Sequence, residues 1–202
     1  MKLVLATRNR HKADEICSIL SLPSGSVFSA LDLPELPDVE EDGATLVENA
    51  IKKARTVAAA SRLWALADDS GLEVDALGGA PGVFSAIYAG SPPDPEANNR
   101  KLLAALQGAL NRRARFRTVL ALASPDGWTD TVEGIVEGSI AESPRGKHGF
   151  GYDPLFIPEG ESRTFAEMRP EEKNRISHRA RALEQARRTW GPVFARIGLI
   201  RA

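Results

Sequence analysis

Cysteine is nearly absent from this chain, and so are long apolar runs. Cys17 is the only cysteine in the sequence, which excludes an internal disulfide and fits a reducing compartment. Its spacing from Ile16, Ile19 and Leu20 is helical, which indicates a core side chain rather than a nucleophile. No stretch approaches the ~18 apolar residues that span a bilayer, and the apolar run at the start is too short for a signal peptide. We therefore expect a cytoplasmic protein with no membrane segment.

The sequence also lacks an excess of charge of either sign. Lysine and arginine number 26 against 27 acidic residues, so the formal net charge is -1. Such a chain has no general field that attracts a nucleic-acid backbone, so we expect no nucleic-acid partner and only local anion sites. With 43% apolar and 6% aromatic residues, the composition is that of an ordinary globular protein. Its length favours one domain over residues 1–202, or one domain with two lobes.

In the first part of the chain, short apolar runs alternate with segments of helical periodicity. Residues 2–6 predict a buried strand, and 12–21 predict a helix that follows it. A capping box of the form Thr-x-x-Glu begins the helix predicted over 45–61. Residues 64–67 predict a further strand, which we expect to stop at Asp68. This alternation favours an α/β sheet with helices on its faces.

The rest of the chain adds a hairpin and a long last helix. Residues 33–38 are proline-rich and predict an irregular connection, whereas 95–107 predict a helix. Strands are predicted over 115–123 and 129–142, and an Asp-Gly turn joins them. The hairpin makes the sheet mixed. The last helix is expected over 171–190, after a proline and before a Gly-Pro pair.

The first candidate site is the run Thr7-Arg8-Asn9-Arg10-His11-Lys12, where a strand gives way to a helix. Backbone N–H groups, polar side chains and a lysine converge there, which is typical of a phosphate site. The glycine spacing of a P-loop is absent. The alternative is that Thr7 or Asn9 only caps the helix.

Two acidic clusters form the second candidate site, Glu40-Glu41-Asp42 before a helix and Asp68-Asp69 at the end of a strand. Carboxylates packed side by side are costly unless a positive group separates them, and Mg²⁺ suits a few carboxylates with water and substrate phosphates. The alternative for the first cluster is a solvated acidic loop that favours the helix N-terminus.

The third candidate is Gly149-Phe150-Gly151-Tyr152-Asp153-Pro154, and the fourth lies at the start of the last helix. Glycine allows close approach of a ligand, and the Phe150 ring offers a face on which a base can stack; the alternative is a tight turn with a core ring. In the fourth, Lys173 and Ser177 share a helix face, for which a solvated charged surface is the alternative. His178 is a poor metal candidate because no other histidine stands at ligand spacing from it.

These segments, in this order, resemble the Ham1-like family of non-standard purine nucleoside triphosphate pyrophosphatases, also called inosine triphosphate pyrophosphatases. The resemblance covers nearly the whole chain and is carried by LATRNRHKADEI, EEDGATLVENAIKKA, ADDSGLEVDALGGAPGVFSAIYAG, GFGYDPLFIPEG, TFAEM and EKNRISHRARAL. It implies an elongated mixed β-sheet flanked by helices, with two lobes and an active-site cleft between them, and a homodimer. It also implies hydrolysis of inosine, deoxyinosine and xanthosine triphosphates (ITP, dITP, XTP) to the monophosphate and pyrophosphate, which cleanses the nucleotide pool.

The resemblance also implies roles for single residues. Asp69, Lys12 and Lys53 would be catalytic, with Asp69 orienting or deprotonating the attacking water. Mg²⁺ would be held by Glu40 and Asp69, with Glu41 and Asp68 in support. The substrate would contact residues of the opening loop, the acidic strand end, the glycine-rich segment and the last helix: Thr7, Arg8, Asn9, Arg10, His11, Lys12, Ser70, Phe150, Gly151, Tyr152, Asp153, Lys173, His178 and Arg179. Among these, Phe150 would stack on the base, Asp153 would bind its edge, and the residues of the last helix, Lys173, His178 and Arg179, would close the base pocket.

Departures from the family pattern are mild. Arg8 and Arg10 replace small residues, and Phe84 and Ile87 stand where Tyr and Arg are common. One alternative is the related Maf-like pyrophosphatase family, but its serine-rich opening loop is absent here. The other is a catalytically silent nucleotide-binding protein, against which the complete set of acidic and lysine residues argues.

Overall fold

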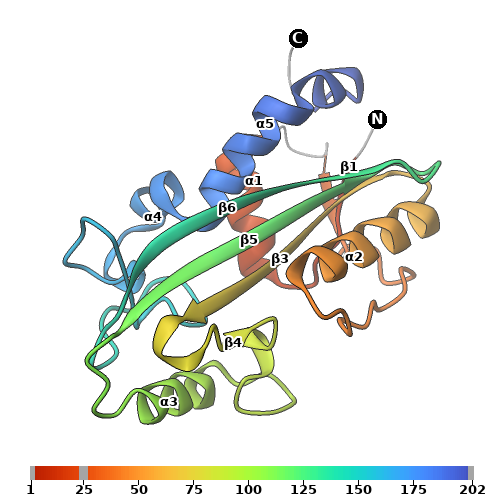
Figure 1. Cartoon of the computed structure of the whole chain (residues 1–202). Coiled ribbons are helices and arrows are strands. Elements are labelled where there is room, and N and C mark those ends of the chain that lie inside the picture. The colour runs from red at the N-terminus through yellow and green to blue at the C-terminus, as the bar shows by residue number, and fades with distance from the viewer. Residues whose placement is uncertain (1–2, 23–26, 200–202) are drawn as a thin grey trace. The chain divides into compact units, whose positions relative to one another are not determined.

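The computed structural model describes residues 3–22 and 27–199, which form a mixed α/β fold (Figure 1). The sheet has the order β2-β1-β3-β5-β6-β7, and β4 pairs with β3 off this path. β1 is parallel to β2 and β3, whereas β4 and β7 are antiparallel to their neighbours, so the predicted mixed sheet is confirmed. The strands are β1 (Leu3–Leu5), β2 (Val27–Ser29), β3 (Trp64–Val74), β4 (Pro81–Gly82), β5 (Arg113–Ala123), β6 (Thr129–Ile140) and β7 (Phe156–Pro158).

Five α-helices are assigned among the described residues, with short 3-10 helices between some elements. No helix in this part of the chain has the length and apolar character needed to cross a membrane. The helices are α1 (Arg10–Leu20), α2 (Leu46–Ser61), α3 (Pro95–Ala105), α4 (Pro170–Ile176) and α5 (His178–Arg196), and the 3-10 helices are η1 (Asp75–Leu77), η2 (Ser85–Ile87) and η3 (Phe165–Glu167).

The chain divides into two compact units. Unit 1 consists of Met1–Asp69, Thr118–Gly134 and Arg179–Ala202, and unit 2 of Ser70–Arg117 and Ile135–His178. The long strands β3, β5 and β6 therefore each contribute residues to both units.

The core of unit 1 lies between its strands and the helices α1 and α5. Leu3, Leu5 and Leu66 are buried there with Ile16 of α1 and Trp190 of α5. The Trp190 indole N–H donates to a carboxylate oxygen of Asp130 at 2.8 Å, which satisfies its polar group at the edge of this core.

The core of unit 2 is built around aromatic side chains. Phe116 of β5 packs on Phe156 of β7 with ring centroids 4.7 Å apart, and Phe165 of η3 lies 5.2 Å from Phe156. Leu102 of α3 is fully buried in the same cluster. This packing fixes α3 and the segment around β7, which flank the glycine-rich candidate site.

The predicted hairpin and the predicted start of α2 are confirmed. β5 and β6 are joined by the Asp-Gly turn, in which the Ser124 N–H donates to the Trp128 carbonyl at 2.9 Å. The Thr45 hydroxyl accepts from the Glu48 N–H at 3.1 Å, as an N-cap does. The Glu48 carboxylate reaches the N–H of Ala44 rather than that of Thr45, so the capping contact extends one residue further back than predicted.

The prediction that the strand after α2 stops at Asp68 is wrong, because β3 continues through Asp68 and Asp69 to Val74. The strand persists because Leu72 and Val74 are fully buried in unit 2 and both carboxylates have cationic partners within unit 1. Charged residues can occupy the interior of a strand when each one is paired.

The single last helix over 171–190 is also wrong, since the chain forms α4 and α5 with an extended residue, Ser177, between them. Moreover, α5 continues through Gly191 and Pro192 to Arg196. A proline removes one backbone hydrogen bond, but Trp190 and Phe194 on either side are buried in the core of unit 1. Tertiary packing therefore outweighs the local stop signal.

Candidate functional site

The opening loop of unit 1 caps α1 and places a lysine beside the acidic strand. The Asn9 side chain accepts from the Lys12 N–H at 3.3 Å, and the Thr7 hydroxyl accepts from the Asn9 N–H at 3.1 Å. Asn9 therefore caps α1, as the alternative interpretation proposed, but capping is not the only contact that this loop and the first turn of α1 make. One turn into the helix, the Lys12 ammonium lies 2.7 Å from a carboxylate oxygen of Asp68.

The other basic residues of this loop have different surroundings. The Arg8 guanidinium donates to the carbonyls of Ala30 at 3.0 Å and Leu36 at 2.8 Å, and pairs with Asp38 at 2.6 Å. Arg8 thus fastens the irregular loop that precedes the first acidic cluster. Arg10 and His11 are exposed on the first turn of α1.

The two adjacent aspartates of β3 point to opposite faces of the strand. Successive side chains alternate across a strand, and Asp68 contacts Lys12 of α1 while Asp69 contacts Lys53 of α2. The expectation that positive groups accompany the two carboxylates is met by protein cations. Each aspartate has its own cationic partner.

Asp68 belongs to a buried ion network. Its carboxylate accepts from Arg179 Nε at 2.8 Å and Nη2 at 3.3 Å, and Lys12 contacts the same group. Glu15 of α1 binds Nη1 of Arg179. Burial opposes the ionised form of Asp68, but Arg179 and Lys12 outweigh it and hold the pKa of that carboxyl well below its usual range. Asp68 is therefore a fixed negative charge.

Asp69 has a different electrostatic balance. The Lys53 ammonium lies 2.7 Å from Asp69, 2.7 Å from Glu41 and 2.9 Å from the Asp68 carbonyl. Burial raises the pKa of the Asp69 carboxyl above its ordinary value, and Lys53 only partly compensates. For Lys53, burial favours the neutral amine, but Asp69 and Glu41 outweigh burial and raise its pKa. Lys53 stays protonated, and Asp69 is the better proton acceptor of the two aspartates.

The first acidic cluster is held against α2 by its own backbone. The Gly43 N–H donates to the Asn49 side chain at 2.8 Å, and a Cβ at Gly43 would lie 2.6 Å from the same oxygen. Asp42 pairs with Lys52 and Glu41 with Lys53, and all three acidic residues of the cluster, Glu40 included, are exposed. Glu41, expected only in support, is thus the glutamate of this cluster that shares a partner with Asp69.

Within 3–22 and 27–199, no group of three or more His, Cys, Asp or Glu side chains is gathered tightly enough to hold a metal ion. The donors that the sequence offers here, Glu40, Glu41 and Asp69, are carboxylate oxygens. Such hard ligands fit Mg²⁺, which also takes oxygen from water and substrate phosphates. A site completed by substrate therefore suits these residues better than a closed protein cage.

In unit 2, the glycine-rich segment is closed by Asp153 and Lys173. One carboxylate oxygen of Asp153 accepts from the Phe150 N–H at 2.8 Å and from the Lys173 ammonium at 2.6 Å. The same ammonium lies 4.9 Å from the centroid of the half-buried Phe150 ring. The structure thus brings together the three predicted base-binding residues Phe150, Asp153 and Lys173.

Lys173 of α4 and the three residues that follow α4 are buried, which rules out the solvated-surface alternative for them. Lys173, Ser177, His178 and Arg179 are at most 4% exposed. The His178 ring stacks on Phe116 at 4.5 Å between centroids within unit 2. Arg179 instead belongs to the ion network of Asp68 in unit 1. Its ion pairs with Asp68 and Glu15 differ from the contacts that Lys173 makes with Asp153 and Phe150.

The remaining predicted residues lie in unit 2. Ser70 is a partly buried residue of β3. The buried Tyr152 hydroxyl donates to the Ser85 carbonyl at 2.9 Å, and the Gly151 carbonyl accepts from Asn99 of α3 at 3.0 Å. Burial raises the pKa of Tyr152, so this hydroxyl keeps the proton that it donates.

Sequence reasoning missed Glu15, Asn49 and Asn99, which hold predicted site residues or their loops in place. Asn49 carried a usable signal, because it is a polar residue on the same mostly apolar face of α2 as Leu46 and Ala50. Glu15 and Asn99 had none, since their partners lie far away in the sequence.

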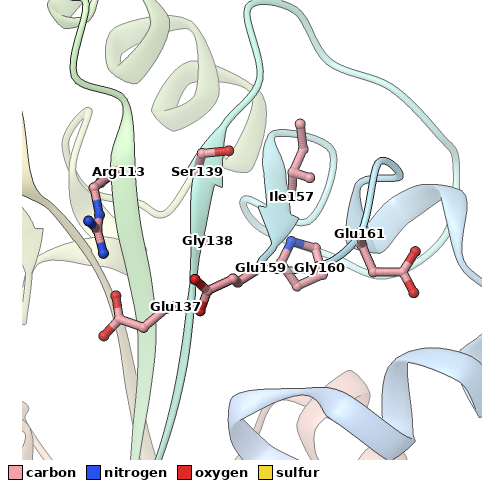
Figure 2. A pocket seen from close by; sticks show the side chains of 9 residues that line it. Arg113, Glu137, Gly138, Ser139, Ile157, Glu159, Gly160 and Glu161 are labelled. Carbon is pink, nitrogen blue, oxygen red and sulfur yellow. The ribbon is translucent and has the colours of Figure 1, made fainter.

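A separate hollow of about 310 Å³ lies on unit 2 between β6 and the segment around β7 (Figure 2). Figure 2 shows Glu137 and Ser139 on one side and Ile157, Glu159 and Glu161 on the other. No residue of the predicted site lines it. This hollow therefore plays no part in the candidate site.

Known proteins are similar to this chain over most of its length. The model of the Ham1 family matches residues 3–189. A protein of Desulforamulus reducens named dITP/XTP pyrophosphatase is 52% identical over 188 residues, covering 92% of this chain and 94% of the relative. A protein of the same name from Elusimicrobium minutum is 51% identical over 191 residues, covering 92% and 97%. The structure of the Staphylococcus aureus Ham1 protein is similar with a TM-score of 0.85 and 39% identity, covering 96% of this chain and all of that one. The chain therefore belongs to the Ham1 family.

Proposed function

We propose that this protein hydrolyses the triphosphates of non-standard purine nucleosides, namely ITP, dITP and XTP, to the monophosphate and pyrophosphate, and thereby cleanses the nucleotide pool. The relatives named dITP/XTP pyrophosphatase support the reaction and the substrate class. The observation that carries the proposal is the pair of ammonium groups, Lys12 and Lys53, each held at 2.7 Å by one of two adjacent aspartates. Such fixed cations suit a substrate with several negative charges.

In the proposed reaction, the protein acts mainly by positioning the phosphates and the attacking water. Lys12, with Thr7 and Asn9 of the opening loop, binds the phosphates, and Lys53 neutralises charge that develops on them. The oxygen of a water attacks the α-phosphorus, the bond from that phosphorus to the bridging oxygen breaks, and pyrophosphate leaves. The proton of the water passes to Asp69, whose raised pKa makes it the better acceptor.

We propose Mg²⁺ as the cofactor, held by Glu40 and Asp69 with Glu41 in support. When bound, it would supply positive charge at the phosphate oxygens. The carboxylate oxygens of these residues and the exposure of Glu40 support this assignment. Asp68 is committed to Arg179 and Lys12, so its part is to fix Lys12.

Recognition of the base is assigned to unit 2. We propose that the base stacks on Phe150 and that Lys173, which carries only N–H donors, lies at its edge with Asp153. Inosine and xanthosine have a carbonyl at C6, where adenine has an amino group. Donors at that edge bind the carbonyl and leave adenine with opposed donors, which disfavours ATP.

Phe150→Ala is expected to weaken base binding without altering phosphate binding. Stacking on an aromatic side chain contributes about 1–3 kcal/mol per base, so KM for ITP should rise by about 5- to 150-fold. Inhibition by pyrophosphate, which lacks a base, should be unchanged. The matched control is Phe84→Ala, because this ring is 64% exposed. An equal loss of pyrophosphate inhibition would show that the base does not stack on Phe150.

The function is tested by turnover of ITP, dITP, XTP, ATP and GTP with Mg²⁺, with pyrophosphate and orthophosphate measured separately. We expect pyrophosphate from the three non-standard nucleotides and little product from ATP or GTP. Orthophosphate as the product would contradict the reaction assignment. Tight binding without turnover would instead indicate a silent nucleotide-binding protein.

We further propose a homodimer located in the cytoplasm. The single half-buried thiol, Cys17, suits a reducing compartment. Light scattering after size-exclusion chromatography tests the dimer, and a mass of one chain at micromolar concentration would contradict it.

A further inference from the structure

The segment Gly149–Asp153 has one tightly defined backbone shape. Gly149 and Gly151 have positive φ angles of 72° and 61°, which favour glycine. A Cβ at Gly149 would lie 2.0 Å from the Asp153 carboxylate, the same group that accepts from the Phe150 N–H. Asp153 therefore holds the backbone at Phe150 from within the same segment and helps to set the orientation of the Phe150 ring.

A second set of contacts holds this segment from α3 and η2. The Asn99 amide of α3 donates to the Gly151 carbonyl at 3.0 Å, and the Tyr152 hydroxyl donates to the Ser85 carbonyl at 2.9 Å. Both contacts fall on the residues directly after Phe150. The Gly151 peptide group and the Tyr152 side chain are thus held by α3 and η2, which carry none of the predicted site residues.

The neighbouring Asn98 makes that helix and turn one rigid support. Its amide nitrogen donates to the carbonyls of Ser85 at 3.3 Å and Ala86 at 2.9 Å, and its oxygen accepts from the Ala89 N–H at 2.6 Å. Three hydrogen bonds from one side chain of α3 thus hold η2 and the residues after it. The contact from Tyr152 is made to the same Ser85 carbonyl.

Packing alone does not explain the asparagine at position 99, because a buried polar side chain is less favourable there than an apolar one. Its side chain is buried, and its Oδ1 has no hydrogen-bond partner among the described residues. A buried amide oxygen without a partner is destabilising, and a leucine, whose side chain branches in the same way, would avoid it. The contact that the amide does make is the one to Gly151.

We infer that Asn99 is a positioning residue for base recognition, which acts by holding the Gly151 carbonyl and thereby the orientation of Phe150. This inference rests on the proposed function only in assigning a purine base to Phe150. It predicts that loss of the amide donor weakens binding of the base and leaves binding of the phosphates unchanged. A purely structural residue would affect both through stability.

The test is calorimetric binding of inosine monophosphate and of pyrophosphate, each alone, to the full chain and its variants. Asn99→Leu and Asn99→Asp both remove the N–H donor but differ in polarity, and each should weaken inosine monophosphate binding by about 3- to 10-fold, as for one neutral hydrogen bond. The affinity for pyrophosphate should not change. The thermal midpoint of Asn99→Leu should stay close to that of the wild type, because removal of the unpaired Oδ1 offsets loss of the contact to Gly151.

The control is Arg100→Leu, on the same helix, whose side chain is exposed and pairs only with Glu96 in the described structure. It should alter neither affinity. Wild-type affinity for inosine monophosphate in both Asn99 variants, or equal losses for the two ligands, would overturn the inference. Absence of inosine monophosphate binding by the wild type would overturn it as well. Normal binding together with no release of pyrophosphate from ITP would contradict the proposed function and leave the role of Asn99 standing.

Discussion

Asp69→Asn is expected to lower kcat for ITP by about 10²- to 10⁴-fold, the range associated with loss of a general base. Asparagine keeps the shape of the side chain and can still accept from the Lys53 ammonium, which lies 2.7 Å from Asp69. It cannot take the proton of the attacking water, and it removes a charge from the proposed Mg²⁺ ligands. The measurement is the steady-state rate of pyrophosphate release at saturating ITP and Mg²⁺.

Two further measurements separate this loss from unfolding. The thermal midpoint should stay close to that of the wild type, because asparagine keeps the contact to Lys53. The calorimetric affinity for inosine monophosphate should also stay close, because base recognition is assigned to unit 2. Asp14→Asn is the matched control, since Asp14 is exposed on α1 and has no assigned role. A wild-type kcat in Asp69→Asn would remove this residue from the mechanism, and an equal loss in Asp14→Asn would indicate a general charge effect.

The fold could be predicted from the sequence wherever a local signal decides the structure. The N-cap of α2 and the Asp-Gly turn of the hairpin are set by residues next to one another, and both are confirmed. The end of β3 and the break at Ser177 were missed for the opposite reason. An acidic pair normally ends a strand, but Asp68 is neutralised by Arg179, which lies 111 residues further along the chain.

The sequence indicated which residues would gather at the candidate site, but it did not indicate which of them pair with one another. Lys12, Asp68 and Asp69 were expected near one another, and the structure brings them together in unit 1. Periodicity along a strand predicts that adjacent residues face opposite ways, so the separation of Asp68 from Asp69 could have been read from the sequence. The choice of Arg179 as the partner of Asp68 could not, because it depends on how α5 packs.

In unit 2, the sequence indicates the residues of the candidate site but not the residue that supports them. The sequence marks Phe150 and Asp153 through the glycines around them, but it contains no sign that Asn99 holds Gly151. An asparagine within a helical pattern ordinarily predicts only a solvent-facing position. Its burial becomes visible when α3 is placed beside the glycine-rich segment, so supporting residues are harder to predict than contacting ones.

Arg179→Met is expected to lower the free energy of unfolding by about 3–5 kcal/mol, because it leaves a buried carboxylate without its main partner. Arg179 is 1% exposed and binds both Asp68 and Glu15, whose charges would face each other across an apolar side chain. Arg179→Lys keeps the charge but loses the forked contact, so its loss should be intermediate. Urea denaturation of each variant measures the change.

The matched control is Arg188→Met on the same helix, since Arg188 is exposed and pairs with Glu184 at the surface. Surface ion pairs contribute about 0–1 kcal/mol, so this variant should unfold almost as the wild type does. A similar small loss in Arg179→Met would show that Asp68 finds another partner or takes up a proton. If Asp68 takes up a proton, Lys12 loses the charge that holds it for the phosphates, and KM for ITP should rise. An unchanged KM for ITP would indicate that another cation has replaced Arg179.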